Sequence, residues 1–282
     1  RHLVRVLLVG LAILAAGGHP GRAAAAGPFA AWKHTGSVFI LTTPLGADLL
    51  AGVHVEQFPL LVRLHADTFD FSQAQADGAD LRFTTADGTA LVHEIESWDA
   101  GRGAAAVWVR MPRIDGNAVQ ELRLHWGNPA AKRESNGRAV FDASNGYLSV
   151  WHMGDEIVDA AGTIESRDNG TTPVAGVVAT YPTGAESHTT QAWFRPVKPN
   201  GLVLAWGNEE AQGKVTMNFR SPPHVAMDCY FSGGNVEGKT DLGMGRWVHV
   251  VHTYSEGETR LYVDGVLDTA NLNARPPMKI NR

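Results

Sequence analysis

The chain has 282 residues, 44% of them hydrophobic, and this length corresponds to about two domains of roughly 100 to 200 residues each. Its formal net charge of -5 comes without a basic cluster, which argues against binding to the phosphate backbone of nucleic acid or to an anionic membrane surface. The single cysteine, Cys229, excludes an intramolecular disulfide bond and every zinc site that needs several cysteines.

The first residues have the order of a secretory signal peptide. Arg1 and Arg5 precede an apolar run from Val6 to Ala16, and small residues follow as far as Ala26. The apolar run is short for a membrane span, and no other run is longer. We therefore predict a signal peptide over residues 1–26 and an exported protein, periplasmic, in the cell envelope or extracellular, without a transmembrane segment in the mature chain.

From Trp32 onward the pattern is that of an all-β protein, with short alternating runs separated by Gly, Pro, Asn and Asp. Helical periodicity is nearly absent, and only residues 71–76 and 127–134 fit short helical turns. The strands predicted in the first half span residues 37–43, 59–65, 81–84, 91–98, 104–111 and 119–126.

Residues 77–98 predict a hairpin. Asp77-Gly78 and Asp87-Gly88 are turn dipeptides, and apolar residues alternate between and after them. The second strand places Glu94 and Glu96 two residues apart and therefore on one face of the sheet, with Asp99 just beyond.

A change of composition at residues 155–184, where polar and small residues dominate, separates the two halves of the chain. Strand patterns resume at residues 189–195, 201–206, 215–219, 226–231, 247–254 and 259–263. We expect two antiparallel β-sandwich domains in tandem, over residues 27–145 and 146–282.

The second half resembles laminin-G-like, or concanavalin A-like, jelly-roll domains. The matching segments are 189–194 (TTQAWF), 247–254 (WVHVVHTY) and 260–265 (RLYVDG). The resemblance covers residues 147 to 282 approximately and implies a jelly roll. The closing strands of that family are missing after Arg282, so we expect this domain to be incomplete.

The first half resembles the family named domain of unknown function 2341. The matching segments follow in the order of that family: 58–64 (FPLLVRL), 78–83 (GADLRF), 87–89 (DGT), 94–98 (EIESW), 107–109 (VWV), 126–128 (WGN) and 140–142 (VFD). Members are often followed by a laminin-G-like domain, and some are associated with MotA/TolQ/ExbB-type proton channels. The resemblance implies a role in the cell envelope.

The acidic residues of the hairpin are the candidate catalytic group. Glycoside hydrolases of the laminarinase type carry the pattern E-x-D-x-x-E on one strand, and this chain has E-x-E-x-x-D at Glu94, Glu96 and Asp99. Retaining hydrolysis needs two carboxyl groups roughly 5 to 5.5 Å apart. On a regular strand Asp99 faces away from Glu94, and only a bulge brings it round. We therefore favour a structural or ligand-positioning role, with catalysis as the alternative.

Loop carboxylates are the candidate calcium ligands, because calcium takes several oxygen ligands. They are Asp77, Asp80 and Asp87 in the first half, and Asp228 and Asp264 in the second. Asp-Gly is also ordinary turn chemistry, so no metal or other cofactor is required. His249 and His252, three residues apart on one strand, face opposite sides and do not form a chelating pair.

Aromatic residues are the remaining candidates for ligand binding, because an exposed ring stacks against the apolar face of a sugar. Trp108, Trp126, Trp193 and Trp247 lie in alternating strands, where we expect burial. Candidate surface residues are those nearer strand ends: Trp98, Trp151, Trp206 and Tyr230.

The sequence favours an exported, noncatalytic protein that binds an extracellular or cell-wall polysaccharide or another extracellular polymer, or an envelope protein. One alternative is an interaction module of a TolQ/ExbB-type transport system, and another is a laminarinase-like glycoside hydrolase. The carbohydrate reading depends on analogy between folds.

Overall fold

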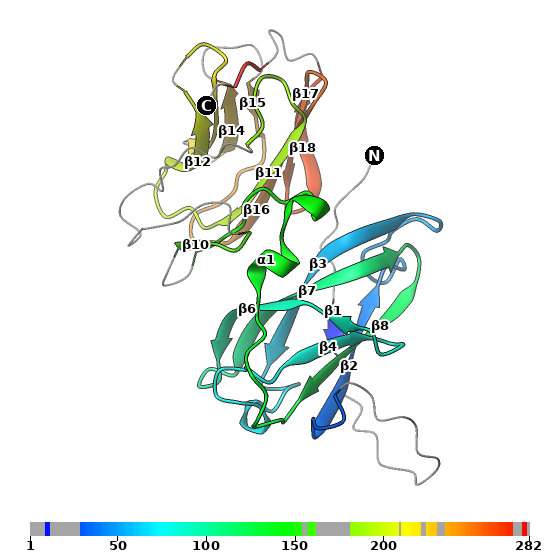
Figure 1. The fold of residues 1–282 in the computed structure, drawn as a ribbon. Coiled ribbons are helices and arrows are strands. Elements are labelled where there is room, and N and C mark those ends of the chain that lie inside the picture. Colours follow the sequence, from blue (N-terminus) through cyan, green and yellow to red (C-terminus); the bar gives the residue numbers. More distant parts are fainter. Residues whose placement is uncertain are drawn as a thin grey trace. The chain divides into compact units, whose positions relative to one another are not determined.

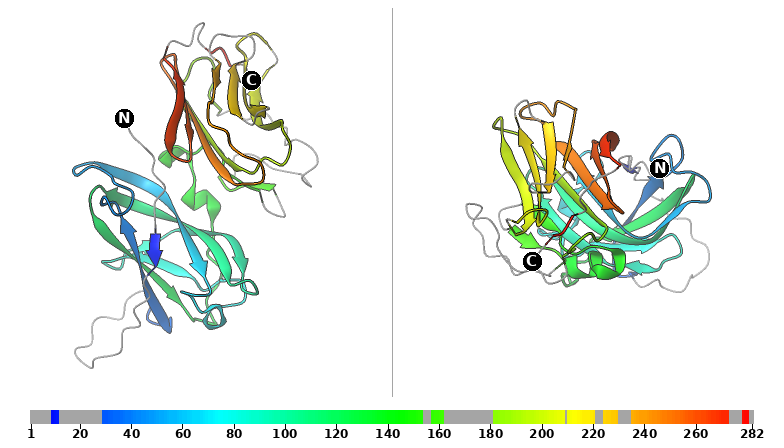
Figure 2. Two further views of the ribbon diagram at one scale, coloured as in Figure 1. Left: turned by 180° about the vertical axis from the view of Figure 1, so that it is seen from behind. Right: turned by 90° about the horizontal axis from the view of Figure 1, so that it is seen from above.

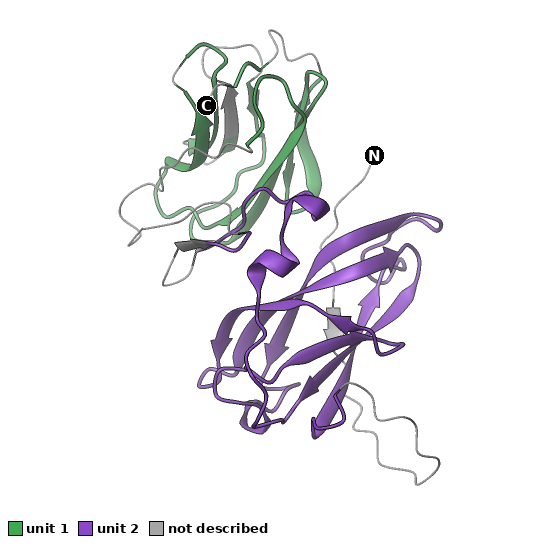
Figure 3. Ribbon diagram, viewed as in Figure 1, with its two compact units in different colours: residues 1–6, 177–282 green, residues 7–176 purple. Residues whose placement is uncertain are grey.

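The computed structural model describes residues 9–11, 29–153, 157–161, 181–208, 210–220, 224–229, 235–272 and 278–280. The chain is all-β, as predicted, and its sheets are antiparallel. It divides into two compact units (Figure 3): unit 2 holds residues 7–176, and unit 1 holds residues 1–6 and 177–282. Within the described residues, no helix is long and apolar enough to cross a membrane.

Unit 2 is a sandwich of a five-stranded and a three-stranded sheet (Figure 1). The first has the order β1 (Val9–Leu11), β2 (His34–Leu41), β8 (Val119–Trp126), β4 (Arg82–Thr85) and β5 (Ala90–Leu91), and the second has β3 (His54–His65), β7 (Ala104–Asp115) and β6 (His93–Asp99). The shorter elements are η1 (Phe71–Gln73), α1 (Gly137–Val140), η2 (Ala143–Asn145), β9 (Trp151–Met153) and β10 (Ile157–Asp159). Only β1 of the predicted signal peptide lies within the described residues.

Unit 1 consists of two four-stranded sheets that face each other, as Figures 1 and 2 show. One has the order β11 (His188–Phe194), β16 (Val248–Ser255), β17 (Glu258–Val263) and β18 (Val266–Asn271). The other has the order β12 (Gly201–Gly207), β13 (Lys214–Arg220), β14 (His224–Cys229) and β15 (Val236–Glu237).

Alternation along the strands builds both cores. In β7 every second residue from Ala105 to Met111 is buried, and in β16 the same holds from Val248 to Tyr254. Because successive side chains of a strand point to opposite faces, one face of each strand joins the apolar core between its sheets. The two cores contain different residues, so each unit has its own.

The hairpin predicted for residues 77–98 forms only in part. β4 pairs with β5 through Phe83–Leu91 and Thr84–Ala90, and the chain then passes to the other sheet, where β6 pairs with β7. Leu91 and Ile95 both pack against the same core, from opposite sheets. The prediction is confirmed for residues 82–91 and wrong for the continuation through residue 98, because an apolar pattern does not determine which sheet a strand joins.

The compact units divide between residues 176 and 177, so residues 146–176 cluster with unit 2. The sequence predicts a domain boundary at 145/146, which puts these residues in the second domain. Among them, β9 pairs with β10, and the Val150 carbonyl accepts a hydrogen bond from the Ala160 N–H at 2.7 Å. The domain boundary stays a prediction.

Candidate functional site

Glu94 and Glu96 reach the same side of β6, as predicted, and both contact one imidazole. Glu94 Oε2 lies 3.0 Å from His152 Nε2, and Glu96 Oε2 lies 3.6 Å from His152 Nδ1. Glu96 also accepts a hydrogen bond from the Trp108 indole N–H at 2.5 Å. The two carboxylates therefore hold a histidine from β9 against the outer face of the β6–β7 pair.

A β-bulge explains how the acidic strand is arranged. The register of β6 against β7 shifts between Ile95 and Ser97, so that Glu96 is the extra residue. Asp99 then pairs with Ala104, on the same outer face as Glu94 opposite Trp108. Four residues of β7 separate these pairs, which is about 13 Å at 3.3 Å per residue. This backbone spacing is well beyond the roughly 5 to 5.5 Å of a retaining carboxyl pair.

The charge of His152 is set by opposing effects. Burial lowers the pKa of its imidazole, but the hydrogen bond to Glu94 and the charges of Glu94 and Glu96 outweigh burial and raise the pKa. The imidazole ring is also stacked on Trp108, with centroids 6.2 Å apart and planes at 21°. The polar atoms of the cluster are therefore directed at one another beside an aromatic ring, and they form an ion pair when the imidazole is protonated.

Two described segments of the same chain, residues 135–153 and 157–161, cover this outer face, and together we call them the cover. Phe141, fully buried, contacts the rings of Trp108, Tyr147 and His152. The cover approaches the strand so closely at Gly137 that a Cβ there would lie 2.5 Å from Glu94 Oε1. Glu94 and Glu96 thus fix the cover in place.

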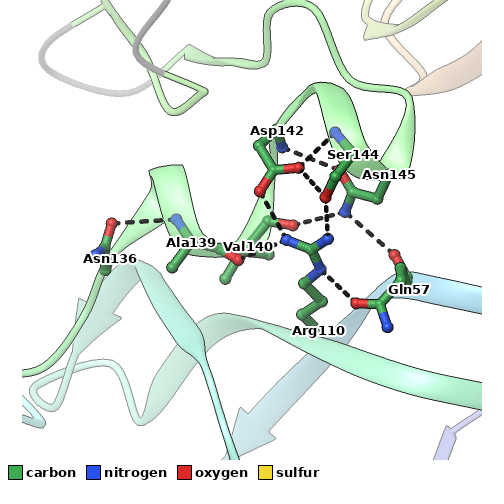
Figure 4. A network of polar contacts seen from close by, with 8 residues as sticks. All are labelled: Gln57, Arg110, Asn136, Ala139, Val140, Asp142, Ser144 and Asn145. Atoms are coloured by element: carbon green, nitrogen blue, oxygen red, sulfur yellow. Dashed lines mark hydrogen bonds and ion pairs between the residues drawn. The ribbon is translucent and has the colours of Figure 1, made fainter.

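Arg110 secures the cover from the neighbouring position on the outer face of β7 (Figure 4). Its guanidinium donates to Gln57 of β3, to the Ala139 carbonyl, to Asp142 at 2.8 Å and to Ser144. Hydrogen bonds from Ser144, followed by those from Arg110, lower the pKa of the Asp142 carboxyl to about 2. The sequence match at residues 140–142 contains Asp142, but nothing in the pattern identifies Arg110 as its partner.

The carboxylates proposed as calcium ligands in unit 2 have protein partners. Asp80, completely buried, accepts backbone N–H groups of Gln75 at 2.8 Å, Gly127 at 2.6 Å and Asn128 at 3.0 Å. Asp77 accepts from the Ala79 N–H and contacts Arg133, while Asp87 accepts hydrogen bonds from two threonines, Thr85 and Thr89.

In unit 1, Asp264 accepts from the His249 N–H and pairs with Arg246, and the side chain of Asp228 is outside the described residues. Across the described parts of both units, no group of three or more His, Cys, Asp or Glu residues is arranged to hold a metal ion.

The tryptophans selected from the sequence as surface candidates are not the most exposed ones. Trp98 packs against the core of unit 2, where Gly78 at φ +69° leaves room for its ring. Trp206 packs against the core of unit 1. Trp151 is half-buried and donates to Ser149, and Tyr230 lies outside the described residues. A role of these residues in ligand binding stays a prediction.

Two tryptophans expected in the core are instead exposed on unit 1. Trp193 of β11 is 56% exposed, and Trp247, immediately before β16, is 62% exposed. The strands alternate as expected, but these two rings are on the outer face of the sheet. Both burial predictions were therefore wrong. Trp126 is buried, as expected, and Trp108 is partly buried.

Trp193 has a polar and aromatic neighbour on the adjacent strand. It pairs with His249 of β16, and the two rings stack with centroids 4.8 Å apart and planes at 21°. His249 Nε2 lies 3.2 Å from the side-chain oxygen of Gln191, two residues before Trp193. Burial lowers the pKa of the His249 imidazole against a smaller opposing effect of Asp264, so the ring is neutral at pH 7.

Gln191, Trp193, Trp247 and His249 define what we call the aromatic platform. Alternation places Trp247 and His249 on the same side of the chain, and Tyr262 of β17 continues the outer face beyond Val251. His249 faces outward while His252 is completely buried, which confirms that these histidines are on opposite faces. The platform offers apolar ring faces beside an amide and an imidazole, the combination that binds the C–H face and hydroxyl groups of a sugar.

Unit 2 also has a hollow of about 420 Å³ between the β4–β5 turn, the end of β7 and the start of β8. Its lining contains no aromatic side chain and includes, of the candidate residues, only Asp87. The lining residues are Thr85, Ala86, Asp87, Met111, Pro112, Arg113, Val119, Gln120 and Glu121.

Comparisons with known proteins match two separate segments of the chain, and the gap between these segments is close to the boundary between the compact units. A solved structure from Bacteroides ovatus, described as a "putative carbohydrate binding protein", aligns over 82% of this chain and 68% of its own, with 11% identity and a TM-score of 0.29. No curated protein matches the chain. Residues 77–149 match the model of the domain of unknown function 2341, and residues 168–280 match that of the concanavalin A-like lectin/glucanases superfamily.

Proposed function

We propose that this chain is a noncatalytic carbohydrate-binding protein whose ligand stacks on the aromatic platform of unit 1. The observation that carries the proposal is the exposure of Trp193 on β11 and of Trp247 immediately before the neighbouring strand β16. Large aromatic side chains are normally buried for most of their surface, and a group of exposed ones on one face is typical of a binding surface. A flat ring beside polar groups suits a pyranose, which has an apolar C–H face and a rim of hydroxyl groups.

The polar groups of the platform support this ligand class. Gln191 and the neutral His249 each have a second polar side-chain atom besides the one they share with each other, and the His249 ring stacks on Trp193. Tryptophan is also among the residues that most often dominate binding energy at protein surfaces. The match of residues 168–280 to a superfamily named for lectins and glucanases supports carbohydrate as the ligand.

The absence of catalysis is part of the proposal. Glu94 and Glu96 are engaged with His152 and Trp108 beneath the cover, and Asp99 is bonded to Arg102 in the following turn. A glycoside hydrolase needs a general acid and a second carboxylate on either side of an accessible glycosidic bond. The catalytic alternative requires the cover to move away from β6.

Export is also part of the proposal, and it rests on the amino-terminal sequence pattern. An exported protein meets extracellular and cell-wall polysaccharides, which fits the platform. An envelope protein or a TolQ/ExbB-type channel as the partner remains a sequence-based alternative, with no feature of the described residues in its favour.

A glycan array with the purified chain tests the proposal, followed by titration of the best ligand. The array should include neutral and acidic polysaccharide fragments. We expect Trp193→Ala to weaken binding roughly 30-fold, the equivalent of about 2 kcal/mol, and Trp193→Phe to retain part of the affinity. Leu202→Ala is the matched control, because Leu202 is exposed on a strand of the opposite sheet, and it should bind like the wild type.

Two results would overturn the proposal. One is the absence of binding to any glycan by the folded chain. The other is glycan binding that Trp193→Ala leaves unchanged, which would place the site elsewhere. Release of reducing sugar from a bound polysaccharide, abolished in Glu94→Gln, would overturn the noncatalytic part alone.

A further inference from the structure

The outer face of the sheet formed by β11, β16, β17 and β18 (Figure 1) continues beyond the aromatic platform. The strand register places Gln191, Val251, Tyr262 and Leu267 opposite one another, one on each strand. The residues next to them in β11, β16 and β17 pack in or against the core, and Leu267 is 48% exposed, so all four face outward. Because β11 and β18 are the edge strands, these residues form a row that crosses the whole sheet, and we call it the cross-strand row.

The cross-strand row adds another aromatic ring to the outer face. Tyr262 is partly exposed and lies two strands away from Trp193, one outward position further along the strands. With neighbouring strands roughly 4.8 Å apart and about 3.3 Å per residue, the backbones of these two residues are about 12 Å apart. One sugar ring is much shorter than this distance. A ligand that stacks on both aromatic rings therefore has several sugars.

Apolar side chains continue the surface on both sides of Tyr262. Val251 precedes it in the cross-strand row, on β16, and Leu267 follows it on β18. Exposed apolar side chains that lie together on one face are typical of an interaction surface. The row therefore provides a continuous strip for the apolar faces of successive sugar rings.

Hydrogen-bonding side chains lie on either side of this strip. His249 of the aromatic platform is one outward position from Val251 on β16, and Thr253 is one outward position from it in the other direction. Thr253 pairs with Thr189 of β11 and with Arg260 of β17, and Arg260 forms an ion pair with Glu258. Hydroxyl, imidazole and guanidinium groups can bind the hydroxyl rims of the sugars.

The opposite sheet has a different outer face in its described part. The outer positions of its central strand β13 hold Lys214, Thr216 and Asn218, which are all polar. Leu202 of β12 is 64% exposed and pairs with Asn218, so its cross-strand neighbour is polar. Leu202 is therefore an exposed apolar residue outside the cross-strand row and serves as the control for it.

We propose that the ligand of unit 1 is a linear polysaccharide, and that several of its consecutive sugars lie across the strands from Trp193 to Leu267. This inference rests on the proposed function and extends its site from one stacked sugar to a chain. One sugar stacks on Trp193 and another on Tyr262, with at least one further sugar between them. Because a pyranose ring is comparable in length to the spacing between strands, four strands have room for about three rings.

The test measures affinity against ligand length, with the full chain in a titration calorimeter. The probes are oligosaccharides from the disaccharide to the hexasaccharide, prepared from β-1,3-glucan, β-1,4-glucan, xylan and mannan. We expect the affinity of the wild type to rise with length up to about the tetrasaccharide. Tyr262→Ala should weaken binding of the hexasaccharide about tenfold and leave binding of the disaccharide unchanged. Tyr262→Phe, which keeps the ring, and Leu202→Ala should bind both ligands like the wild type.

The outcomes separate this inference from the proposed function. Affinity that does not rise beyond the disaccharide overturns the inference alone, as does hexasaccharide binding that Trp193→Ala weakens and folded Tyr262→Ala leaves unchanged. A loss of hexasaccharide binding in Thr189→Ala but not in Tyr262→Ala also overturns it, because the ligand would then lie along β11. No binding at any length, together with an empty glycan array, overturns the proposed function and the inference together.

Discussion

Both sandwiches carry a tryptophan at an outward-facing position in the middle or near the end of a strand. One of the two is covered by the chain and the other is exposed. Trp108 of β7 lies under the cover, in contact with Phe141 and His152, and donates its N–H to Glu96. Trp193 of β11 is more than half exposed and stacks only on its cross-strand neighbour His249 among the ring contacts of the described residues.

The difference teaches that an outer sheet face is available for binding only if no other part of the chain packs across it. In unit 2, the cover (residues 135–153 and 157–161) folds back over β6 and β7 and is held by Arg110, Glu94 and Glu96. The polar residues of that face therefore have structural partners. In unit 1, the corresponding groups of the aromatic platform are directed outward.

Removing the centre of the cover should have the largest effect on this comparison. Phe141→Ala deletes a fully buried ring with three aromatic neighbours and should destabilise unit 2 by about 3–5 kcal/mol. Two units need not unfold in one transition, so hydrogen exchange read by mass spectrometry is the appropriate measurement. Peptides from β6, β7 and the cover should lose protection, whereas those from β11 and β16 should not. Equal loss in both units would contradict separate cores.

A matched pair of substitutions compares the two tryptophans directly. Trp108→Ala removes a partly buried ring and its hydrogen bond to Glu96, and should cost about 2–3 kcal/mol. Trp193→Ala removes an exposed ring and should change stability by less than about 0.5 kcal/mol. Urea denaturation followed by exchange of peptides from each unit measures both. If Trp193→Ala proved the more destabilising, the platform would be a structural feature.

The smallest expected effect is a loss of stability of the cover as the pH rises. His152 gains two carboxylate partners on folding, which raise its pKa above the ordinary value of 6.5. Its folded state therefore binds the proton more tightly than its unfolded state, so this contribution to stability is complete below pH 6.5 and disappears as the pH rises through the folded pKa. The protection factors of cover peptides, which compare the exchange rate with that of an unfolded chain at the same pH, should fall over that interval.

Glu94→Gln is the control for the pH effect, because it removes one charge and keeps the shape of the side chain. In the variant, the protection of the cover against exchange should depend less on pH than in the wild type. The pH dependence of protection in β11 and β16 should not change. A wild-type cover whose protection is the same at pH 6 and pH 9 would show that the His152 ion pairs do not hold it.

Much of the strand pattern follows from the sequence. Alternation in residues 104–111 and 247–254 predicts which side chains share a face, and the structure confirms it for β7 and β16. It also predicts that Glu94 and Glu96 lie together and that His249 and His252 lie apart. These are local properties, because the backbone geometry of a strand fixes the direction of successive side chains.

Only the tertiary structure decided which faces are covered. Phe83 and Leu91 pair in one sheet while Ile95 joins the other, and Trp98 fills the core beside Gly78 although it lies near a strand end. Trp193 and Trp247 alternate like core residues and yet face outward. The sequence by itself determined the all-β class, the tandem arrangement and the sharing of faces. Which face is buried depends on segments distant in sequence, because burial is a property of packing and not of the strand alone.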